Sequence, residues 1–337
     1  MATWYVDANL ATGNHDGTDW TNAYATLSAA MVAKRGTLSE PCIFRCRATA
    51  GTADTAAVAD TGMVTTPTNY VKIYVDQADR HAGVWDATKY RLSVTNANAL
   101  YLESDDIWID GLQIEVTANT AAYCNIYSLS DSRIDISNCI LRGLDNAFYA
   151  SGGILLSVVG TANIWNTFVY GFANGNATPI CMIGAGTANV YSCVAISETN
   201  GYGILRSVGT LVCKNTYARA GTAYAFSGTM TCTNCASADH TADDHGGANN
   251  LVDIAYGADT FVNVTATTED FHLAADGLSP LQGTGTNTTG DSAPLNFTTD
   301  IDGQTIGASW SIGADNIAGS GLSVFVYEST IVDEFNG

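Results

Sequence analysis

Thr161-Ala-Asn-Ile-Trp-Asn-Thr-Phe168 recurs 26 residues later, with similar residues at most positions, as Thr187-Ala-Asn-Val-Tyr-Ser-Cys-Val194. Apolar and polar residues alternate in both segments, which is typical of a β-strand with one buried face. Four further segments align with this pair: Asp106-Ile-Trp-Ile-Asp-Gly-Leu-Gln113, Arg133-Ile-Asp-Ile-Ser-Asn-Cys-Ile140, Thr210-Leu-Val-Cys-Lys-Asn-Thr-Tyr217 and Thr229-Met-Thr-Cys-Thr-Asn-Cys-Ala236. An internal repeat built on a strand predicts a stacked solenoid.

One small residue occupies the same place in every repeat, just before the final pair of residues. These anchor residues are Gly111, Asn138, Asn166, Ser192, Asn215 and Asn234. The steps between them are 27, 28, 26, 23 and 19 residues, which fits a coil with fixed strands and variable loops. Because Asn and Gly tolerate the left-handed backbone conformation, we expect a sharp bend at each anchor. We also expect the anchor asparagines to hydrogen-bond one another along the axis.

Small or apolar side chains occur two residues before each anchor and one residue after it. The first set is Ile109, Ile136, Ile164, Val190, Cys213 and Cys232, and the second is Leu112, Cys139, Thr167, Cys193, Thr216 and Cys235. Since side chains alternate across a strand, we expect both sets to point into the solenoid. The predicted fold is all-β, a right-handed parallel β-helix.

The alternate positions of the same strands predict an outward-facing strip. Its residues are Trp108, Asp110, Asp135, Asn163, Trp165, Asn189, Tyr191 and Lys214. Strands about 4.8 Å apart make the strip roughly 20 Å long. Aromatic rings stack on sugar rings, and amides and acids bind sugar hydroxyls, so the strip is a candidate glycan-binding face. The alternative is a subunit interface or a surface under a loop, since aromatic residues are also enriched at interfaces.

Charge limits the possible partners of this chain. Its 337 residues include 33 acidic and 13 basic side chains, a net charge of −20. That field repels nucleic acid and anionic membranes, so we expect neither as a partner. No run approaches the ~18 apolar residues of a membrane span. The nine cysteines are interpreted as small buried hydrophobic residues, with disulfides or metal ligation as the alternative.

The start of the chain predicts a cap on the solenoid. Residues 22–35 have the pattern of a short helix, with Tyr24, Leu27, Met31 and Val32 at approximately helical spacing, and Gly36 is its expected stop. The first residues lack the basic and apolar regions of a secretory signal, so we expect folding in a cytoplasm unless a signal was removed.

Motifs at both ends carry a family resemblance. Near the start they are Trp4-Tyr-Val-Asp7 and Asp16-Gly-Thr-Asp-Trp20. Near the end they are Asp259-Thr-Phe-Val-Asn263, Asp270-Phe-His-Leu273, Leu278-Ser-Pro280, Asp300-Ile-Asp-Gly303 and Trp310-Ser-Ile-Gly-Ala314. Together they resemble the N-terminal cap and closing coils of pectin-lyase-like right-handed β-helix proteins. That family includes polysaccharide lyases and hydrolases, surface proteins, and bacteriophage tailspikes and other virion proteins, so the resemblance implies the fold and not the activity.

A polysaccharide lyase or glycoside hydrolase is the enzymatic alternative. A lyase of this fold needs cations or basic residues and a Lys, Arg or Tyr base, yet of four lysines only Lys214 is expected on the strip. A hydrolase needs two carboxylates, for which Asp110 and Asp135 are the candidates, because neighbouring coils can place carboxylates about 5–10 Å apart. Solvated surface acids are the competing interpretation.

One loop has the composition of a metal site. The segment from His240 to His245 offers His240, Asp243, Asp244 and His245, and zinc or another metal could be held by such a set. A flexible loop with spare polar residues is the simpler account, so we predict no metal and no cofactor.

We predict three parts: an N-terminal cap in residues 1–40, the β-helix with its closing coils in 41–316, and a C-terminal extension in 317–337. The extension contains Leu322-Ser-Val-Phe-Val-Tyr-Glu328, an apolar strand that favours pairing with a partner. The leading hypothesis is a bacteriophage virion structural protein, a surface-exposed spike, fibre or decoration subunit assembled in the host cytoplasm. Its expected partners are itself as a homotrimer, by analogy with tailspikes, other virion proteins through the extension, and a cell-surface polysaccharide. An extracellular location is the alternative.

Overall fold

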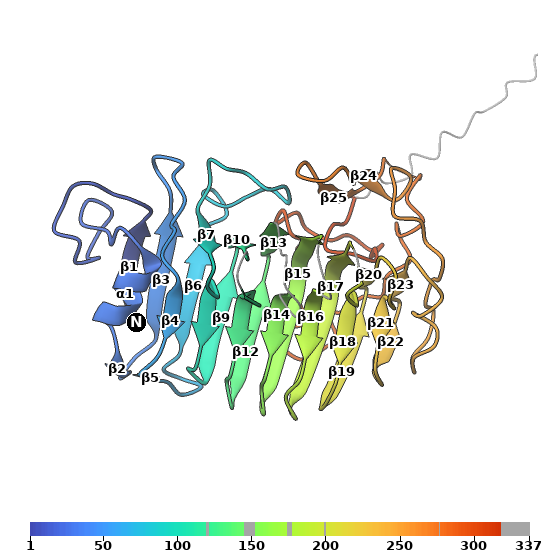
Figure 1. The fold of residues 1–337 in the computed structure, drawn as a ribbon, viewed down its shortest axis with the longest axis horizontal. Coiled ribbons are helices and arrows are strands. Elements are labelled where there is room, and N and C mark those ends of the chain that lie inside the picture. The colour runs from blue at the N-terminus through green and yellow to red at the C-terminus, as the bar shows by residue number, and fades with distance from the viewer. Residues whose placement is uncertain (119–120, 145–151, 174–176, 199, 276, 318–337) are drawn as a thin grey trace, which may run out of the picture.

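The computed structural model describes residues 1–118, 121–144, 152–173, 177–198, 200–275 and 277–317. Strands of successive coils pair in parallel along the axis of an elongated solenoid (Figure 1). The predicted right-handed parallel β-helix is therefore confirmed. The predicted interaction strand at 322–328 lies outside the described residues.

The largest sheet has 14 strands in two rows that merge at β15 and β17. The first row contains the repeat segments: β1 (Ala2–Asp7), β3 (Cys42–Arg47), β6 (Val71–Val75), β9 (Asp106–Asp110), β12 (Arg133–Ser137), β15 (Thr161–Phe172), β17 (Thr187–Ser197), β19 (Thr210–Lys214) and β22 (Thr231–Thr233). The second row adds β7 (Arg91–Thr95), β10 (Gln113–Thr117), β13 (Ile140–Leu144), β20 (Tyr217–Arg219) and β23 (Ala236–Ser237). The anchor residues lie at the bend between the two rows.

A seven-stranded parallel sheet closes the other side of the coils. Its strands are β4 (Val58–Asp60), β8 (Leu100–Leu102), β11 (Cys124–Ser128), β14 (Gly152–Leu156), β16 (Thr178–Met182), β18 (Ile204–Arg206) and β21 (Phe226–Ser227). Two small sheets complete the fold: β2 (Gly36–Thr37) with β5 (Met63–Val64), and β24 (Phe261–Asn263) antiparallel to β25 (Asp270–Leu273).

The anchors adopt the left-handed backbone that their residue types predict. The φ angles are 75° for Gly111, between 47° and 52° for the asparagines, and 48° for Ser192. The residues expected to point inward are buried, including the isoleucines and the cysteines of the repeats. All nine cysteines are free, eight of them buried and Cys181 half-buried, which confirms their interpretation as small hydrophobic residues.

The N-terminal end is closed by a shorter helix than expected, α1 (Leu27–Ala33). Thr26 caps it by accepting a hydrogen bond from the Ala29 amide, and its buried face consists of Leu27, Ala30 and Met31. The expectation that Val32, also in the apolar pattern of the sequence, lies outside this face and is 50% exposed. Within the described residues no helix is long and apolar enough to cross a membrane.

The C-terminal part differs from the closing coils that were expected. Only β24 and β25 are strands after residue 250 in the described residues. Instead of adding coils, the described residues after 250 return along the outside of the solenoid, and Phe261, Phe271 and Ile312 pack on the second row, where they bury Phe168 and Tyr217. Such a return segment removes the apolar side chains on the outer face of the second row from water, which is favourable.

Candidate functional site

The predicted strip exists as two registered rows of side chains on the first row of strands. One row runs through Lys72, Trp108, Asp135, Asn163 and Asn189. The other runs through Tyr74, Asp110, Ser137, Trp165, Tyr191 and Lys214. The expectation that Lys214 is the only lysine on the strip is therefore wrong. Aligning Val71–Val75 with the repeats would have placed Lys72 and Tyr74 on it.

Half of this strip is covered by the segment 284–299, which we call the strap. Trp165 and Tyr191 are only 5% and 6% exposed, because they pack against Leu295 of the strap. The Lys214 ammonium is ion-paired with Asp291 of the strap at 2.7 Å. The prediction that Trp165, Tyr191 and Lys214 are exposed is thus corrected. This half of the strip is a surface under a loop, which was the alternative to an exposed glycan-binding face.

The anchor asparagines hold the strap more than they hold one another. One amide contact of the predicted kind is present, from Asn166 Nδ2 to Asn138 Oδ1 at 3.3 Å. Beyond it, Asn166 donates to the Thr299 carbonyl at 2.7 Å and Asn234 to the Thr284 carbonyl at 2.8 Å. Asn215 donates to the Thr286 carbonyl and accepts from the Thr286 amide, both at 2.7 Å. The predicted bonding between anchor asparagines is thus confirmed for Asn166 with Asn138, whereas the side-chain amides of Asn215 and Asn234 donate to the strap.

An amide relay fixes the polar side chains of the strip. Asn189 Nδ2 donates to Asn163 Oδ1 at 2.9 Å, and Asn163 Nδ2 donates to Asp135 Oδ1 at 2.7 Å. Asp135 also forms an ion pair with Arg133 at 2.5 Å. Asp135 and Asn163 are each 5% exposed, so these groups are mostly committed to one another.

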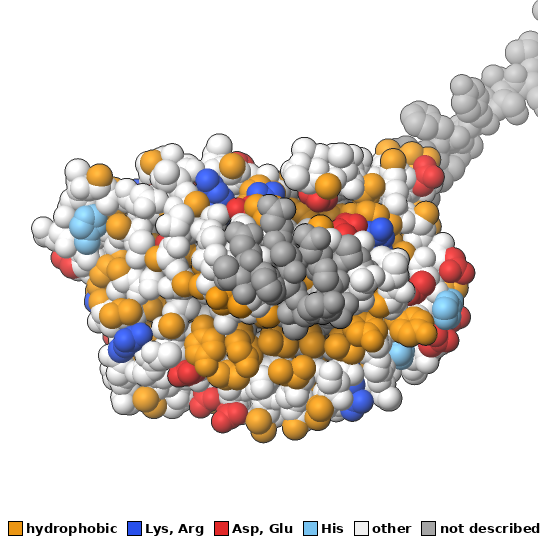
Figure 2. Space-filling view, in the orientation of Figure 1, with side chains coloured by type: hydrophobic (Ala, Val, Ile, Leu, Met, Phe, Trp, Pro, Cys, Tyr) orange, Lys and Arg blue, Asp and Glu red, His pale blue; other side chains and the backbone are white. Residues whose placement is uncertain are grey.

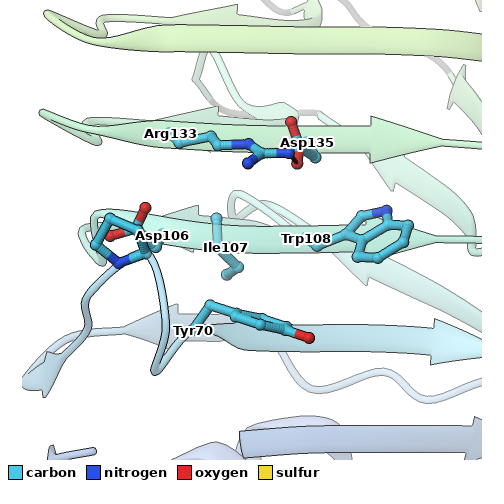
Figure 3. Close-up of a pocket in the computed structure, with 7 residues that line it drawn as sticks. Tyr70, Asp106, Ile107, Trp108, Arg133 and Asp135 are labelled. Carbon is cyan, nitrogen blue, oxygen red and sulfur yellow. Dashed lines mark ion pairs between the residues drawn. The ribbon is translucent and has the colours of Figure 1, made fainter. Parts of the chain in front are cut away.

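The uncovered half of the strip contains a pocket of about 190 Å³, far more than the ~10–15 Å³ that one water occupies. Its walls come from β9, β12 and the turn before β6. The lining residues are Pro67, Tyr70, Asp106, Ile107, Trp108, Arg133 and Asp135. In Figure 3 the Arg133 side chain runs along β12 toward Asp135, and the Tyr70 ring lies on the β6 side of β9. Of the predicted strip, Trp108 and Asp135 contribute to this pocket.

Trp108 is held in one orientation. Its indole Nε1 donates to Ser137 Oγ at 3.1 Å, and the Lys72 ammonium lies 3.5 Å from its ring centroid. Ser137 in turn donates to Asp110 Oδ1 at 2.9 Å. A half-buried aromatic side chain fixed in this way loses little conformational entropy when a ligand binds.

Each basic side chain around the pocket lies close to an acid. Lys72 and Arg80 share Asp110, at 3.8 Å and 3.9 Å. Arg45 is paired with Asp76, and Arg133 with Asp135. Burial raises the pKa of Asp106, although a hydrogen bond from Ser132 opposes the shift. Burial lowers the pKa of Lys72, because it disfavours the charged ammonium, and the nearby Asp110 opposes this shift. Asp106 adds a fourth acid to these four basic groups, so among the described residues no excess positive charge is left to neutralise a uronate.

Asp110 does not line the pocket, although the sequence made it a catalytic candidate with Asp135. Its Oδ1 accepts hydrogen bonds from Ser137 Oγ and from Asn138 Nδ2, the latter at 2.7 Å. Asp110 therefore organises the bend at an anchor. The carboxylates that the pocket brings together are Asp106 and Asp135, a pair that sequence reasoning did not form, and it missed Arg133 and Tyr70 as lining residues.

The loop with the predicted metal candidates does not gather its ligands. His240 and Asp244 are 3.8 Å apart and 67% and 57% exposed. The His245 ring instead packs near Phe226, at 6.3 Å between ring centroids. Within the described part of the chain, His240, Asp243, Asp244 and His245 form no cluster with metal-ligand spacing.

A histidine with neighbouring carboxylates lies within the C-terminal segment itself. The potential ligand atoms of His272, Asp302 and Asp315 lie within 4.8 Å of one another. The His272 ring is engaged on both sides, by Asp270 at 2.5 Å and by Asp302 at 3.0 Å. Burial opposes protonation of His272, but these two hydrogen bonds outweigh it and raise its pKa to about 10. The imidazolium itself thus serves as the cation among these carboxylates. One signal for this cluster was present in the sequence, the Asp270-Phe-His-Leu273 motif.

Comparison with known proteins gives one fold neighbour to report. No family model matches the chain, and no curated protein matches it. Among solved structures it is similar to pectate lyase Pel9A, at 14% identity and a TM-score of 0.35, over 94% of this chain and 97% of that one. The similarity concerns the β-helix fold alone, which the strand pairing already establishes.

Proposed function

We propose that the pocket formed by β9, β12 and the turn before β6 binds a glycan without net charge. The observation that carries this proposal is the pre-oriented Trp108 beside Tyr70, in a pocket whose polar walls are Asp106, Arg133 and Asp135. The indole supplies a surface for a sugar ring, and the carboxylates and the guanidinium supply acceptors and donors for hydroxyls. Because the basic groups near the pocket are offset by an equal number of acids, a neutral sugar fits better than a uronic acid.

The test is binding of the full chain to a panel of neutral and acidic polysaccharides. Trp108→Ala and Tyr70→Ala should each weaken binding to a neutral member at least about tenfold, which corresponds to 1.4 kcal/mol. Tyr224→Ala is the matched control, because Tyr224 is 54% exposed but does not line the pocket. Binding confined to acidic polysaccharides, or undiminished in Trp108→Ala, would contradict the proposal.

A glycoside hydrolase is the second candidate, favoured by the pair Asp106 and Asp135. Asp106 is opposite Arg133 in the strand register, so Asp135 lies one strand over and two residues along. Strand spacings of about 4.8 Å and 3.3 Å per residue put the two residues about 8 Å apart, within the range of an inverting pair. The raised pKa of Asp106 fits an acid, and ion-paired Asp135 fits a base. Release of reducing ends that is lost in Asp106→Asn would establish hydrolysis.

The biological setting stays the proposal that the sequence suggested. In it, the chain is a surface-exposed subunit of a bacteriophage virion, a homotrimer that contacts other virion proteins through residues 317–337. The polar, acidic exterior and the β-helix support this setting, and an extracellular polysaccharide-active protein is the alternative. Immunogold labelling of purified virions with an antibody against the chain would decide between them, since absence of label would exclude the virion.

A further inference from the structure

The outer face of the seven-stranded sheet carries an unbroken row of uncharged side chains. In register, the row runs through Ala59, Tyr101, Tyr127, Leu155, Cys181, Leu205 and Ser227. Their neighbours along each strand, such as Ile126 and Ile154, are buried in the core. A sheet that has core packing on one side normally presents polar residues on the other. This sheet presents aromatic and aliphatic residues on both sides.

The turns beyond these strands extend the same surface. Val159, Ile183 and Val208 are 63%, 40% and 49% exposed. We call these three, together with Tyr101, Tyr127, Leu155, Cys181 and Leu205, the apolar face. Figure 2 shows a band of hydrophobic side chains running along this side of the solenoid. Monomeric proteins rarely expose so many contiguous apolar side chains without using them.

The dimensions of the apolar face suit the centre of a protein interface. Four strand spacings separate Tyr101 from Leu205, about 19 Å, and the turn residues widen the band to roughly 15 Å, giving about 300 Å² of planar surface. A standard interface buries about 800 Å² on each partner, with an apolar centre and a polar rim. The rim here would include Ser157 and Ser207, which flank the exposed turn residues.

We propose that this apolar face packs against the same face of a second copy of the chain. Charge selects this face for a contact between two copies. Two chains of net charge −20 repel one another wherever their acidic surfaces meet, so they can associate only through a face without charges. Two flat sheet faces with side chains at regular strand spacings can pack about 10 Å apart. The proposal is independent of glycan binding, since the pocket lies on the other sheet.

Sedimentation of the full chain over a wide range of concentration and salt tests the proposal. We expect the chains to associate in pairs through this face, because a face that packs against its own copy is used up after two copies. The association should strengthen as NaCl is added, because salt screens the repulsion and leaves apolar burial intact. Val159→Asp and Leu155→Asp should each weaken association at least about tenfold. Val262→Asp is the matched control, since Val262 is 53% exposed on β24, away from the face. Circular dichroism verifies folding, and Val159→Asp keeps the test valid if Leu155→Asp does not fold.

Three results would overturn the proposal. The first is a monomer at every concentration and salt condition. The second is an equal weakening by Val262→Asp and Val159→Asp. The third is a monomer that binds phosphatidylcholine vesicles and loses that binding in Val159→Asp, which would assign the face to a lipid surface. Loss of glycan binding with association unchanged would leave this proposal standing and refute only the glycan pocket.

Discussion

Replacing Asn215 with glycine should release the strap while leaving the solenoid coil intact. Asn215 is fully buried with φ of 50°, a conformation that glycine adopts without strain. Its side chain makes two hydrogen bonds of 2.7 Å to the main chain of Thr286. Each such bond contributes about 1 kcal/mol net, so Asn215→Gly should remove about 2 kcal/mol from the free energy that holds the strap closed.

Asn138→Gly is the matched control. Asn138 is also an anchor, with φ of 52°, but its amide donates to Asp110 and not to the strap. Both variants remove an anchor side chain at the same type of bend, so both should lower the free energy of unfolding by a similar amount. They should differ in where the structure loosens.

Hydrogen exchange of peptides covering residues 284–299 is the assay. A loss of about 2 kcal/mol corresponds to roughly 30-fold faster exchange through local opening, expected in Asn215→Gly alone. Trp165 fluorescence should shift to longer wavelength in the same variant, because the strap shields that ring. Unchanged exchange in Asn215→Gly, or equally fast exchange in Asn138→Gly, would refute the inference that the anchors hold the strap.

Two further predictions concern the histidine cluster. Gly83→Ala should lower the free energy of unfolding by about 2 kcal/mol or more, because a Cβ at this φ of +72° would overlap His272 and Asp302. Gly277→Ala, at φ of +81° with open space around it, should cost less when compared by urea denaturation, and equal losses would contradict the steric argument. The pKa of His272 is raised from 6.5 to about 10, so its stabilising contribution is complete below pH 6.5 and is lost as the pH rises through 10. The free energy of unfolding should therefore fall over this window in the native chain and fall less in His272→Gln; parallel pH curves would contradict this assignment.

The local features of the repeats could be predicted because each depends on a few neighbouring residues. The alternation of apolar and polar residues predicted which face of each strand is buried. The small anchor residues predicted the left-handed bends, as Asn138, Asn166 and Asn215 show. These are properties of one coil and its conformational preferences. The stacking of equivalent positions then follows from repetition, which is why the register of Trp108 with Asp135 was predictable from alignment.

Contacts between segments distant in the chain could not be predicted in this way. Leu295 lies 130 residues after Trp165, and nothing in its surroundings indicates which surface it covers. Its segment was expected to form closing coils. Short motifs indicate the local conformation of the chain, and they do not indicate which distant surface a segment packs against. The pocket was partly missed for a related reason. Tyr70 comes from the turn before β6, outside the repeat, and Asp106 begins its strand at a position the alignment did not weigh.

The strap explains why a chemically continuous strip has two different roles. Trp108 and Trp165 come from the same strip and are 6.4 Å apart between ring centroids, yet Trp165 is nearly buried and Trp108 is half-exposed. An apolar residue such as Leu295 gains free energy by covering Trp165, whereas Trp108 is already engaged by Lys72 and Ser137 and borders an open pocket. Repetition therefore creates a uniform surface, and the non-repeating C-terminal segment decides which part of it remains free to bind a ligand. The two ends of the strip should accordingly respond differently to mutation: changes at Trp165 should affect stability, and changes at Trp108 should affect binding.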